Sequence, residues 1–211
     1  MARNPFPRVI PPDQPLCGRE EELRLLLEHA RAGTNVVLSG ARRMGKTTLV
    51  RRVQEALRRE DGLTVFCDLY GVASVEDMAV RVARAILTVT EPLRGLRDKA
   101  RKALLAFRPV IRADGQGLGL TVEPAQTMDG LALLESALDG LARLLPQIKG
   151  PTHVALDEFQ EIREVERGLR IQGLLRARIQ EMNASFFFVG SRRRLLEDMF
   201  TDRKKPFYQS S

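Results

Sequence analysis

The 211-residue sequence predicts an α/β fold, in which a parallel sheet carries helices on both faces. Four short apolar runs, at 35–39, 63–68, 153–156 and 185–189, are each followed by a longer amphipathic segment. Apolar runs without polar alternation are typical of strands that are buried on both faces. Strands that alternate with helices form parallel sheets with right-handed crossovers.

The remaining segments are assigned in chain order. Five prolines within residues 1–17 favour an extended N-terminal segment. The first helix begins at Gly18, carries acidic residues in its first turn, and ends at Gly33. Apolar residues at helical spacing predict further helices at 46–59, 74–88, 94–107, 129–145, 168–182 and 192–200.

Residues 94–125 interrupt this alternation. The stretch 94–107 is a strongly basic helix by pattern, and residues 110–122 are two strand-like runs around the glycine-rich turn 113–117. A hairpin of this kind does not fit between parallel strands. We therefore treat it as a small β-hairpin insertion in a domain that covers residues 18–211.

Composition limits the class of protein. Hydrophobic residues make up 44% and charged residues 29%, which is ordinary for a globular protein, and no apolar run is long enough to span a membrane. No secretory signal is present, so we expect a cytoplasmic protein. Cys17 and Cys67 are too few and too isolated for a disulfide or metal site. The net charge of +7 permits a nucleic-acid partner, although the basic residues are interleaved with acidic ones.

A phosphate-binding motif joins the first strand to its helix. Gly40, Gly45, Lys46 and Thr47 occupy every fixed position of G-x-x-x-x-G-K-[ST]. Glycines allow backbone N–H groups to approach phosphate oxygens, and the helix directs its positive dipole end at the same group. We expect Lys46 to contact the β- and γ-phosphates and Thr47 to bind Mg²⁺. The phosphate-binding residues are then Gly40, Ala41, Arg42, Arg43, Met44, Gly45, Lys46, Thr47 and Thr48.

Two carboxylates follow the third strand. Asp157 and Glu158 come directly after the apolar run 153–156, at the strand end where open α/β sheets bind ligands. Asp157 suits a Mg²⁺ site, reached directly or through water. Glu158 is placed to activate an attacking water, which an NTPase needs and a small-molecule kinase does not.

These motifs together resemble one family. Gly18-Arg19-Glu20-Glu21-Glu22-Leu23, the Arg42-Arg43 doublet of the loop, Leu156-Asp157-Glu158-Phe159-Gln160 and a strand ending in Gly190-Ser191 are similar to those of archaeal-type AAA+ ATPases. These proteins are grouped with the STAND signal-transduction ATPases and belong to the ASCE type of P-loop NTPases. The resemblance implies ATP as the nucleotide, Mg²⁺ as the metal, and an adenine pocket lined by Gly18 and Arg19. It also implies that Ser191 is the sensor 1 residue that helps to position the attacking water; a helix N-cap is the alternative for Ser191.

The resemblance has one departure. Such proteins continue into a fifth strand, a helical lid and often a winged-helix domain, whereas this sequence stops at Ser211. We therefore expect the lid to be missing or truncated. Either the sequence is a fragment of a longer protein, or the site is completed by a homo-oligomer or a partner chain that supplies an arginine finger. Arg192, Arg193 and Arg194 are candidates within the chain, although exposed, solvated arginines are the simpler interpretation.

The leading hypothesis is a Mg²⁺-dependent ATPase, slow in isolation, that couples its nucleotide state to assembly or conformational change. The alternative is a DNA-binding ATPase of replication, repair or mobile elements that uses the basic segment 94–112, including Arg97, Arg101 and Arg108. A small-molecule kinase is less favoured because of Glu158. ATP is preferred to GTP because the family resemblance implies it and no Asn-Lys-x-Asp motif occurs.

Overall fold

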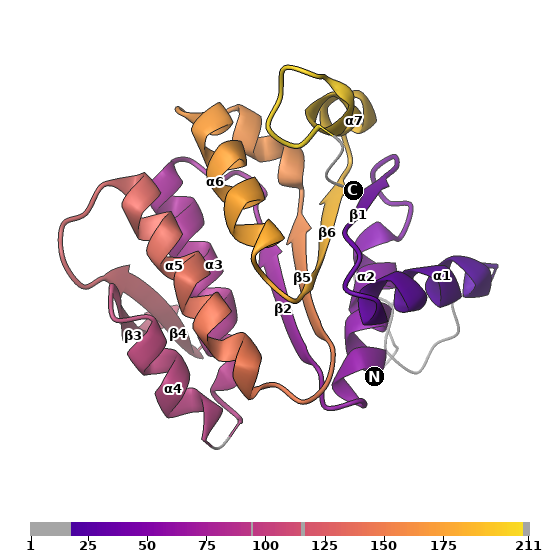
Figure 1. Cartoon of the computed structure of the whole chain (residues 1–211). Coiled ribbons are helices and arrows are strands. Elements are labelled where there is room, and N and C mark those ends of the chain that lie inside the picture. Colours follow the sequence, from indigo (N-terminus) through magenta and orange to yellow (C-terminus); the bar gives the residue numbers. More distant parts are fainter. Residues whose placement is uncertain (1–17, 94, 115–116, 209–211) are drawn as a thin grey trace.

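The central sheet contains four parallel strands whose spatial order differs from their order in the chain. In the computed structural model, which describes residues 18–93, 95–114 and 117–208, the order is β1 (Val36–Ser39), β6 (Ser185–Gly190), β5 (Thr152–Asp157) and β2 (Leu63–Asp68). All three neighbouring pairs are parallel. The predicted α/β class is confirmed, and the carboxyl ends of all four strands lie at the upper edge of the sheet in Figure 1.

Helices cover both faces of the sheet. One face carries α1 (Glu20–Arg31) and α2 (Lys46–Arg58). The other face carries α3 (Val75–Thr90), α5 (Gly130–Leu144), α6 (Gly168–Gln180) and α7 (Arg193–Thr201) (Figure 1). Two short 3₁₀ helices, η1 (Leu145–Gln147) and η2 (Phe159–Arg163), follow α5 and β5.

Strand β6 shows why these segments read as continuous apolar runs. Phe186 and Phe188 point into the core beneath α3, α5 and α6, whereas Phe187 and Val189 pack against α1 and α2. All four side chains are almost fully buried. Because successive strand residues face opposite sides of the sheet, a strand covered on both faces needs apolar residues at every position.

The insertion forms a separate layer. It consists of α4 (Leu96–Ala103), β3 (Phe107–Asp114) and β4 (Gly117–Pro124), and the two strands pair with each other in an antiparallel hairpin. The predicted helix 94–107 was too long at its C-terminal end. Leu104 leaves the helical conformation, and Phe107 pairs with Pro124 because the hairpin takes over the backbone hydrogen bonds from this point. The insertion packs on α3 and α5, on the side away from the sheet (Figure 1).

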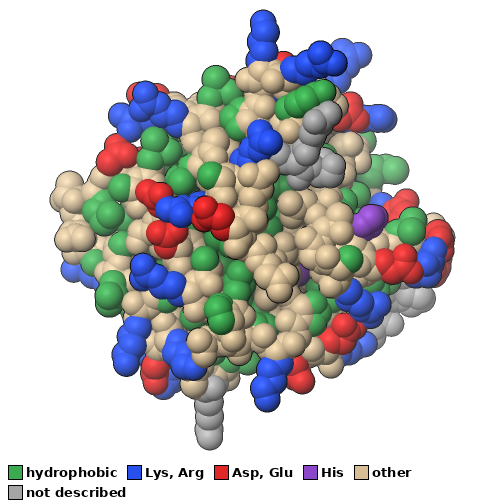
Figure 2. All heavy atoms as spheres, in the orientation of Figure 1, with side chains coloured by type: hydrophobic (Ala, Val, Ile, Leu, Met, Phe, Trp, Pro, Cys, Tyr) green, Lys and Arg blue, Asp and Glu red, His purple; other side chains and the backbone are tan. Residues whose placement is uncertain are grey.

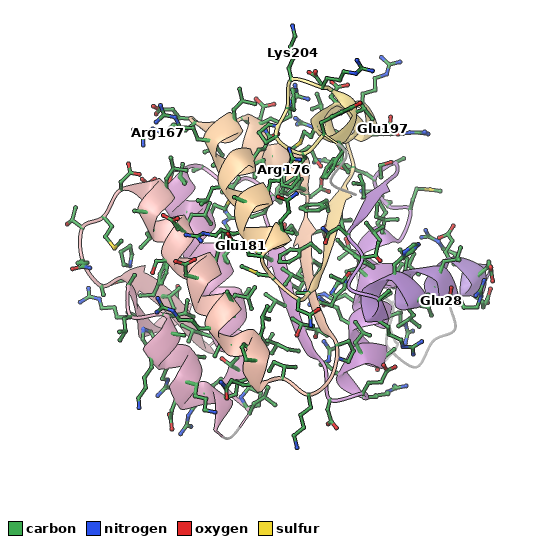
Figure 3. All side chains as sticks on the ribbon, viewed as in Figure 1. Glu28, Arg167, Arg176, Glu181, Glu197 and Lys204 are labelled. Atoms are coloured by element: carbon green, nitrogen blue, oxygen red, sulfur yellow. The ribbon has the colours of Figure 1, made fainter. Side chains whose placement is uncertain are left out.

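The last described segment returns to the core. Arg176 of α6 donates a hydrogen bond to the Pro206 carbonyl, and Figure 3 shows this arginine beside the segment after α7. Phe207 is buried against Phe159 and Phe188. The chain after α7 is therefore packed against α6 and the phenylalanine core.

Charged side chains are distributed over the surface of the protein. Lys and Arg side chains are spread over the face shown in Figure 2, many of them beside Asp or Glu. Within the described ranges, no helix has the length and apolar character needed to cross a membrane. Cys67 is buried and unpaired, and burial raises the pKa of its thiol to about 12. Cys17 and the predicted extended segment 1–17 lie outside the described residues.

Candidate active site

The loop between β1 and α2 turns sharply into the helix. Gly45, the residue before α2, has a left-handed backbone with φ of 71°, and Arg43 adopts φ of 66°. Such a conformation suits glycine but costs about 1–3 kcal/mol in another residue, and it is concentrated at ligand sites. The side chains of residues 41–44 are exposed, so the loop is open to a ligand from solvent.

Lys46 lies folded over this loop. Its side chain is only 7% exposed, and its ammonium group donates hydrogen bonds to the Gly40 and Ala41 carbonyls at 2.7 and 2.8 Å. Burial lowers the pKa of Lys46, and the carboxylates of Glu158 and Asp157 oppose this effect. The side chain predicted to bind phosphate thus lies at the loop, where two backbone carbonyls hold its ammonium group.

Thr47 and Asp157 meet across the site. The Thr47 hydroxyl donates to Asp157 Oδ2 at 2.7 Å, although the two residues are 110 positions apart. The other Asp157 oxygen accepts the Glu158 backbone N–H at 3.0 Å. Asp157 is buried, and burial raises the pKa of its carboxyl group.

This oxygen pair fits Mg²⁺ rather than a metal held by protein alone. In the described part of the chain, no three His, Cys, Asp or Glu side chains gather into a metal site. Mg²⁺ in phosphoryl-transfer sites is commonly bound by one or two protein oxygens together with substrate phosphates and water. Thr47 and Asp157 supply that number of oxygens beside the loop.

Glu158 is held by three donors. Its Oε2 atom accepts hydrogen bonds from the Ser191 hydroxyl at 2.7 Å, the Ser191 backbone N–H at 3.3 Å and the Gln160 amide at 2.5 Å. Burial raises the pKa of Glu158, but these hydrogen bonds outweigh it and the pKa is lowered overall. The carboxylate is therefore ionised at neutral pH, as a base requires. The N-cap alternative for Ser191 is wrong, because α7 begins after Arg192 and has no side-chain cap.

Arg19 reaches the loop from the other side. Its guanidinium group donates to the Met44 carbonyl at 2.5 Å and pairs with Glu22. Gly18, just before it, has a left-handed φ of 77°. The structure therefore brings Arg19 to the phosphate loop, and its predicted role beside adenine stays a prediction.

Comparison with known proteins decides the family. Residues 15–189 match the family described as AAA ATPase domain, which covers most of the chain. The protein belongs to this family. The sequence resemblance to AAA+ ATPases is thus confirmed.

Solved structures show the same fold for this AAA ATPase domain. The Walker-type ATPase of Pyrococcus abyssi matches with a TM-score of 0.59 and 20% identity, over 92% of this chain and 51% of that one. Cdc6p of Pyrobaculum aerophilum gives 0.58 and 14% over 97% and 46%, and the Orc1 protein of Aeropyrum pernix, solved with DNA, gives 0.54 and 16% over 91% and 44%. This chain spans about half the length of these proteins. No curated protein matched.

Two residues close to Glu158 and Asp157 were given no role in the sequence analysis. Gln160 lies inside the quoted motif but had no role assigned; it is 1% exposed and held over Gly190, where a Cβ atom would lie 2.3 Å from its Oε1. Asp68 ends β2 in register with Asp157 and so stands at the same sheet edge. Asp68 could have been predicted from the sequence, because it follows an apolar strand just as Asp157 does.

Two of the three arginines proposed as fingers form ion pairs within the chain. Arg193 pairs with Glu197 at 2.6 Å, and Arg192 lies 3.8 Å from Glu164. Arg194 is exposed on α7. These contacts agree with the simpler interpretation that the three are surface arginines.

Proposed function

We propose that this AAA ATPase domain binds ATP with Mg²⁺ and hydrolyses it at the carboxyl edge of the sheet. The main support for this proposal is the Thr47–Asp157 hydrogen bond of 2.7 Å, which joins the phosphate loop to the strand that precedes Glu158. Lys46 would leave the loop carbonyls to bind phosphate oxygens. Thr47 and Asp157 would hold Mg²⁺, which neutralises charge on the phosphates.

Glu158 favours hydrolysis over transfer to a small molecule. An ionised carboxylate next to the phosphate loop can orient a water molecule and accept its proton. The hydrogen bonds from Ser191 and Gln160 support this role, because they keep Glu158 ionised and fix its direction. In this proposal Ser191 helps to position the water, as the family resemblance implies.

The hydrogen bond between Glu158 and Ser191 also supports a link to conformational change. Glu158 is bound to Ser191, and α7 begins two residues later. A γ-phosphate that draws Glu158 or Ser191 towards itself would therefore move the start of α7. We further propose that a second copy or partner supplies the arginine that speeds hydrolysis, a contribution of about 10³–10⁵ in such enzymes.

Nucleotide binding and phosphate release test this proposal together. Wild-type protein should bind ATP more tightly with Mg²⁺ than with a chelator and release phosphate. Lys46→Ala should lose nucleotide binding. Thr47→Ala should lose the Mg²⁺ effect, whereas Thr47→Ser, which keeps the hydroxyl, should retain it. If the wild type binds ATP with equal affinity with Mg²⁺ and with a chelator, the metal assignment is wrong.

A further inference from the structure

A groove lined by arginines lies at the edge of the sheet, apart from the phosphate loop. It has a volume of about 230 Å³ and runs along β2, the outermost strand of the described sheet, between α2 and α3. Arg51 and Arg58 line it from α2, and Arg81 and Arg84 line it from α3. We call it the β2-edge groove.

Helix spacing places these side chains in two rows. Arg51 and Arg58 are separated by seven residues, which is two turns, and Gln54 lies between them on the same face of α2. Arg81 and Arg84 are separated by three residues on one face of α3. The two rows therefore face the same strand from its two sides.

Three of the four arginines have no acidic partner. Within the described residues, no carboxylate lies within ion-pair distance of Arg51, Arg58 or Arg84. Arg51 stacks on the Phe66 ring at 3.4 Å, and Arg58 donates to the Thr64 hydroxyl at 2.7 Å. Burial lowers the pKa of Arg51 and the like charge of Arg58 adds to this effect, whereas the Asp157 and Asp68 carboxylates oppose it.

Arg81 has a different task in the same groove. It forms hydrogen bonds with the Asp77 carboxylate and with the backbone carbonyls of Asp68 and Tyr70. It therefore fastens the turn after β2 to α3. The positive charge that remains available belongs to Arg51, Arg58 and Arg84, with the Asp68 carboxylate as the acidic group that lines the groove.

The basic segment 94–112 contrasts with this groove. Arg101 pairs with Glu91 at 3.0 Å, Arg108 pairs with Glu123 at 3.0 Å, and Arg97 lies near both Glu91 and Asp98. Ion pairs of this kind reduce the attraction for an external anion. The arginines that the sequence analysis named in segment 94–112 therefore form ion pairs with carboxylates. Three of the four groove arginines, which it did not name, do not form such pairs within the described residues.

Protection of the strand edge does not explain the groove. Charged side chains often keep an edge strand from pairing with another chain. Here the Val65 carbonyl already accepts a hydrogen bond from the Gln54 amide at 2.8 Å. The like charge of Arg58 adds to the burial that lowers the pKa of Arg51, and Asp157 and Asp68 do not fully offset the two, so a bound anion would stabilise the charged form of Arg51.

The spread of charge indicates the size of the anion. Two helical turns separate Arg51 and Arg58 by about 10.5 Å along α2, at about 1.5 Å per residue. A single phosphate cannot touch both, whereas a row of phosphates can. The net charge of +7 disfavours a second copy of this chain as the occupant.

We propose that the β2-edge groove binds the phosphodiester backbone of a nucleic acid, with Arg51, Arg58 and Arg84 as its contacts. Guanidinium groups match phosphate oxygens in geometry and charge. Binding of this type reads the backbone rather than the base sequence and weakens steeply with salt. It does not depend on the ATPase assignment, because none of the three residues belongs to the proposed nucleotide site.

Fluorescence anisotropy with labelled single-stranded and duplex DNA tests the proposal. The full chain is titrated between about 50 and 200 mM salt, and the wild type should bind more weakly as salt increases. The double variant Arg58→Gln, Arg84→Gln should bind at least about tenfold more weakly. Its salt slope on duplex should fall by about 2, at roughly 0.9 for each lost phosphate contact.

Two control variants make the outcome decisive. Arg97→Gln, Arg101→Gln removes two charges from α4 and should bind as the wild type does. Arg58→Lys, Arg84→Lys keeps the charges and should retain most of the binding, while thermal melting confirms that every variant is folded. The proposal is overturned if the wild type binds neither DNA at about 50 mM salt, or if the groove and α4 variants weaken binding equally.

Discussion

At the scale of single residues, Glu158 is the side chain on which the proposed hydrolysis depends. A buried carboxylate would ordinarily hold its proton more tightly, yet hydrogen bonds from Ser191 and Gln160 lower its pKa. The sequence identified Glu158 and Ser191, but their contact joins residues 33 positions apart and depends on β5 and β6 being neighbours. Gln160 is only two residues from Glu158, but it escaped notice because the direction of its side chain depends on packing over Gly190 of the neighbouring strand.

Removing the Gln160 amide should move the acid limb of the pH–rate profile. Gln160→Ala deletes a donor to ionised Glu158, so the pKa of Glu158 should rise. Since the base acts only when ionised, kcat/KM for ATP should then begin to fall at a higher pH than in the wild type. Gln172→Ala, at another buried glutamine, is the control. An unchanged acid limb would exclude Gln160 as a positioning residue for Glu158.

His153 gives a second residue-scale prediction, on stability. It is fully buried in β5, and burial lowers the pKa of its imidazole to about 3, against about 6.5 in the unfolded chain. The unfolded state therefore binds the extra proton between these values. The stabilisation is complete above about pH 6.5 and is lost as pH falls, by up to about 1.4 kcal/mol per pH unit.

Denaturant unfolding at several pH values measures this effect. Between about pH 6.5 and 5, above the range in which most carboxyl groups titrate, the wild type should lose free energy of unfolding. His153→Leu should show a flatter dependence. His29→Gln, which changes the other histidine of the chain at an exposed site, should keep the wild-type slope. Equal slopes in all three proteins would contradict the prediction.

At the scale of elements, four phenylalanines join the segment after Glu158 to α7 and to the residues that follow it. Phe159 follows Glu158 directly and packs against Phe188 of β6, Phe200 of α7 and Phe207, with ring centroids 4.7–6.2 Å apart. Apolar spacing predicted β6 and α7 from local sequence. It could not predict that residues so far apart form one cluster, because that depends on strand order.

Phe207→Ala should destabilise the fold strongly. Phe207 is 1% exposed, and large-to-small changes at such sites cost about 3–5 kcal/mol. Leu169→Ala on α6, where the side chain is 60% exposed, should change the free energy of unfolding by no more than about 0.5 kcal/mol. Urea denaturation of both variants provides the comparison. Similar small losses in the two would show that the cluster does not hold the chain after α7.

At the scale of the whole molecule, the sequence predicted the class of fold and the strand–loop–helix arrangement around the phosphate-loop motif. Local sequence patterns were enough to predict the four strands, the alternating helices and the hairpin. These patterns are the apolar runs, the helical spacing of apolar residues and the glycine-rich turn. The spatial order β1-β6-β5-β2 does not follow from them, because it is set by packing between distant segments. For the same reason, the pairing of Arg101 with Glu91 and the unpaired charge in the β2-edge groove became visible only in the fold.

Nucleotide binding should stabilise the whole fold. A ligand that binds only the native state at about 100 times its Kd adds about 2.7 kcal/mol of stability. Mg²⁺ with ATP should therefore raise the Tm of the wild type, and a chelator should reduce the effect. Lys46→Ala should show no increase. If Mg²⁺ and ATP do not change the Tm of the wild type, ATP is not the ligand.

In the proposed mechanism Glu158 activates water but is not needed for ATP binding. Single-turnover hydrolysis by Glu158→Gln, measured beside its equilibrium affinity for Mg²⁺ and ATP, tests this most directly. We predict wild-type affinity with hydrolysis slowed by about 10²–10⁴-fold, the usual contribution of general base catalysis. Hydrolysis at the wild-type rate with unchanged affinity would contradict the account.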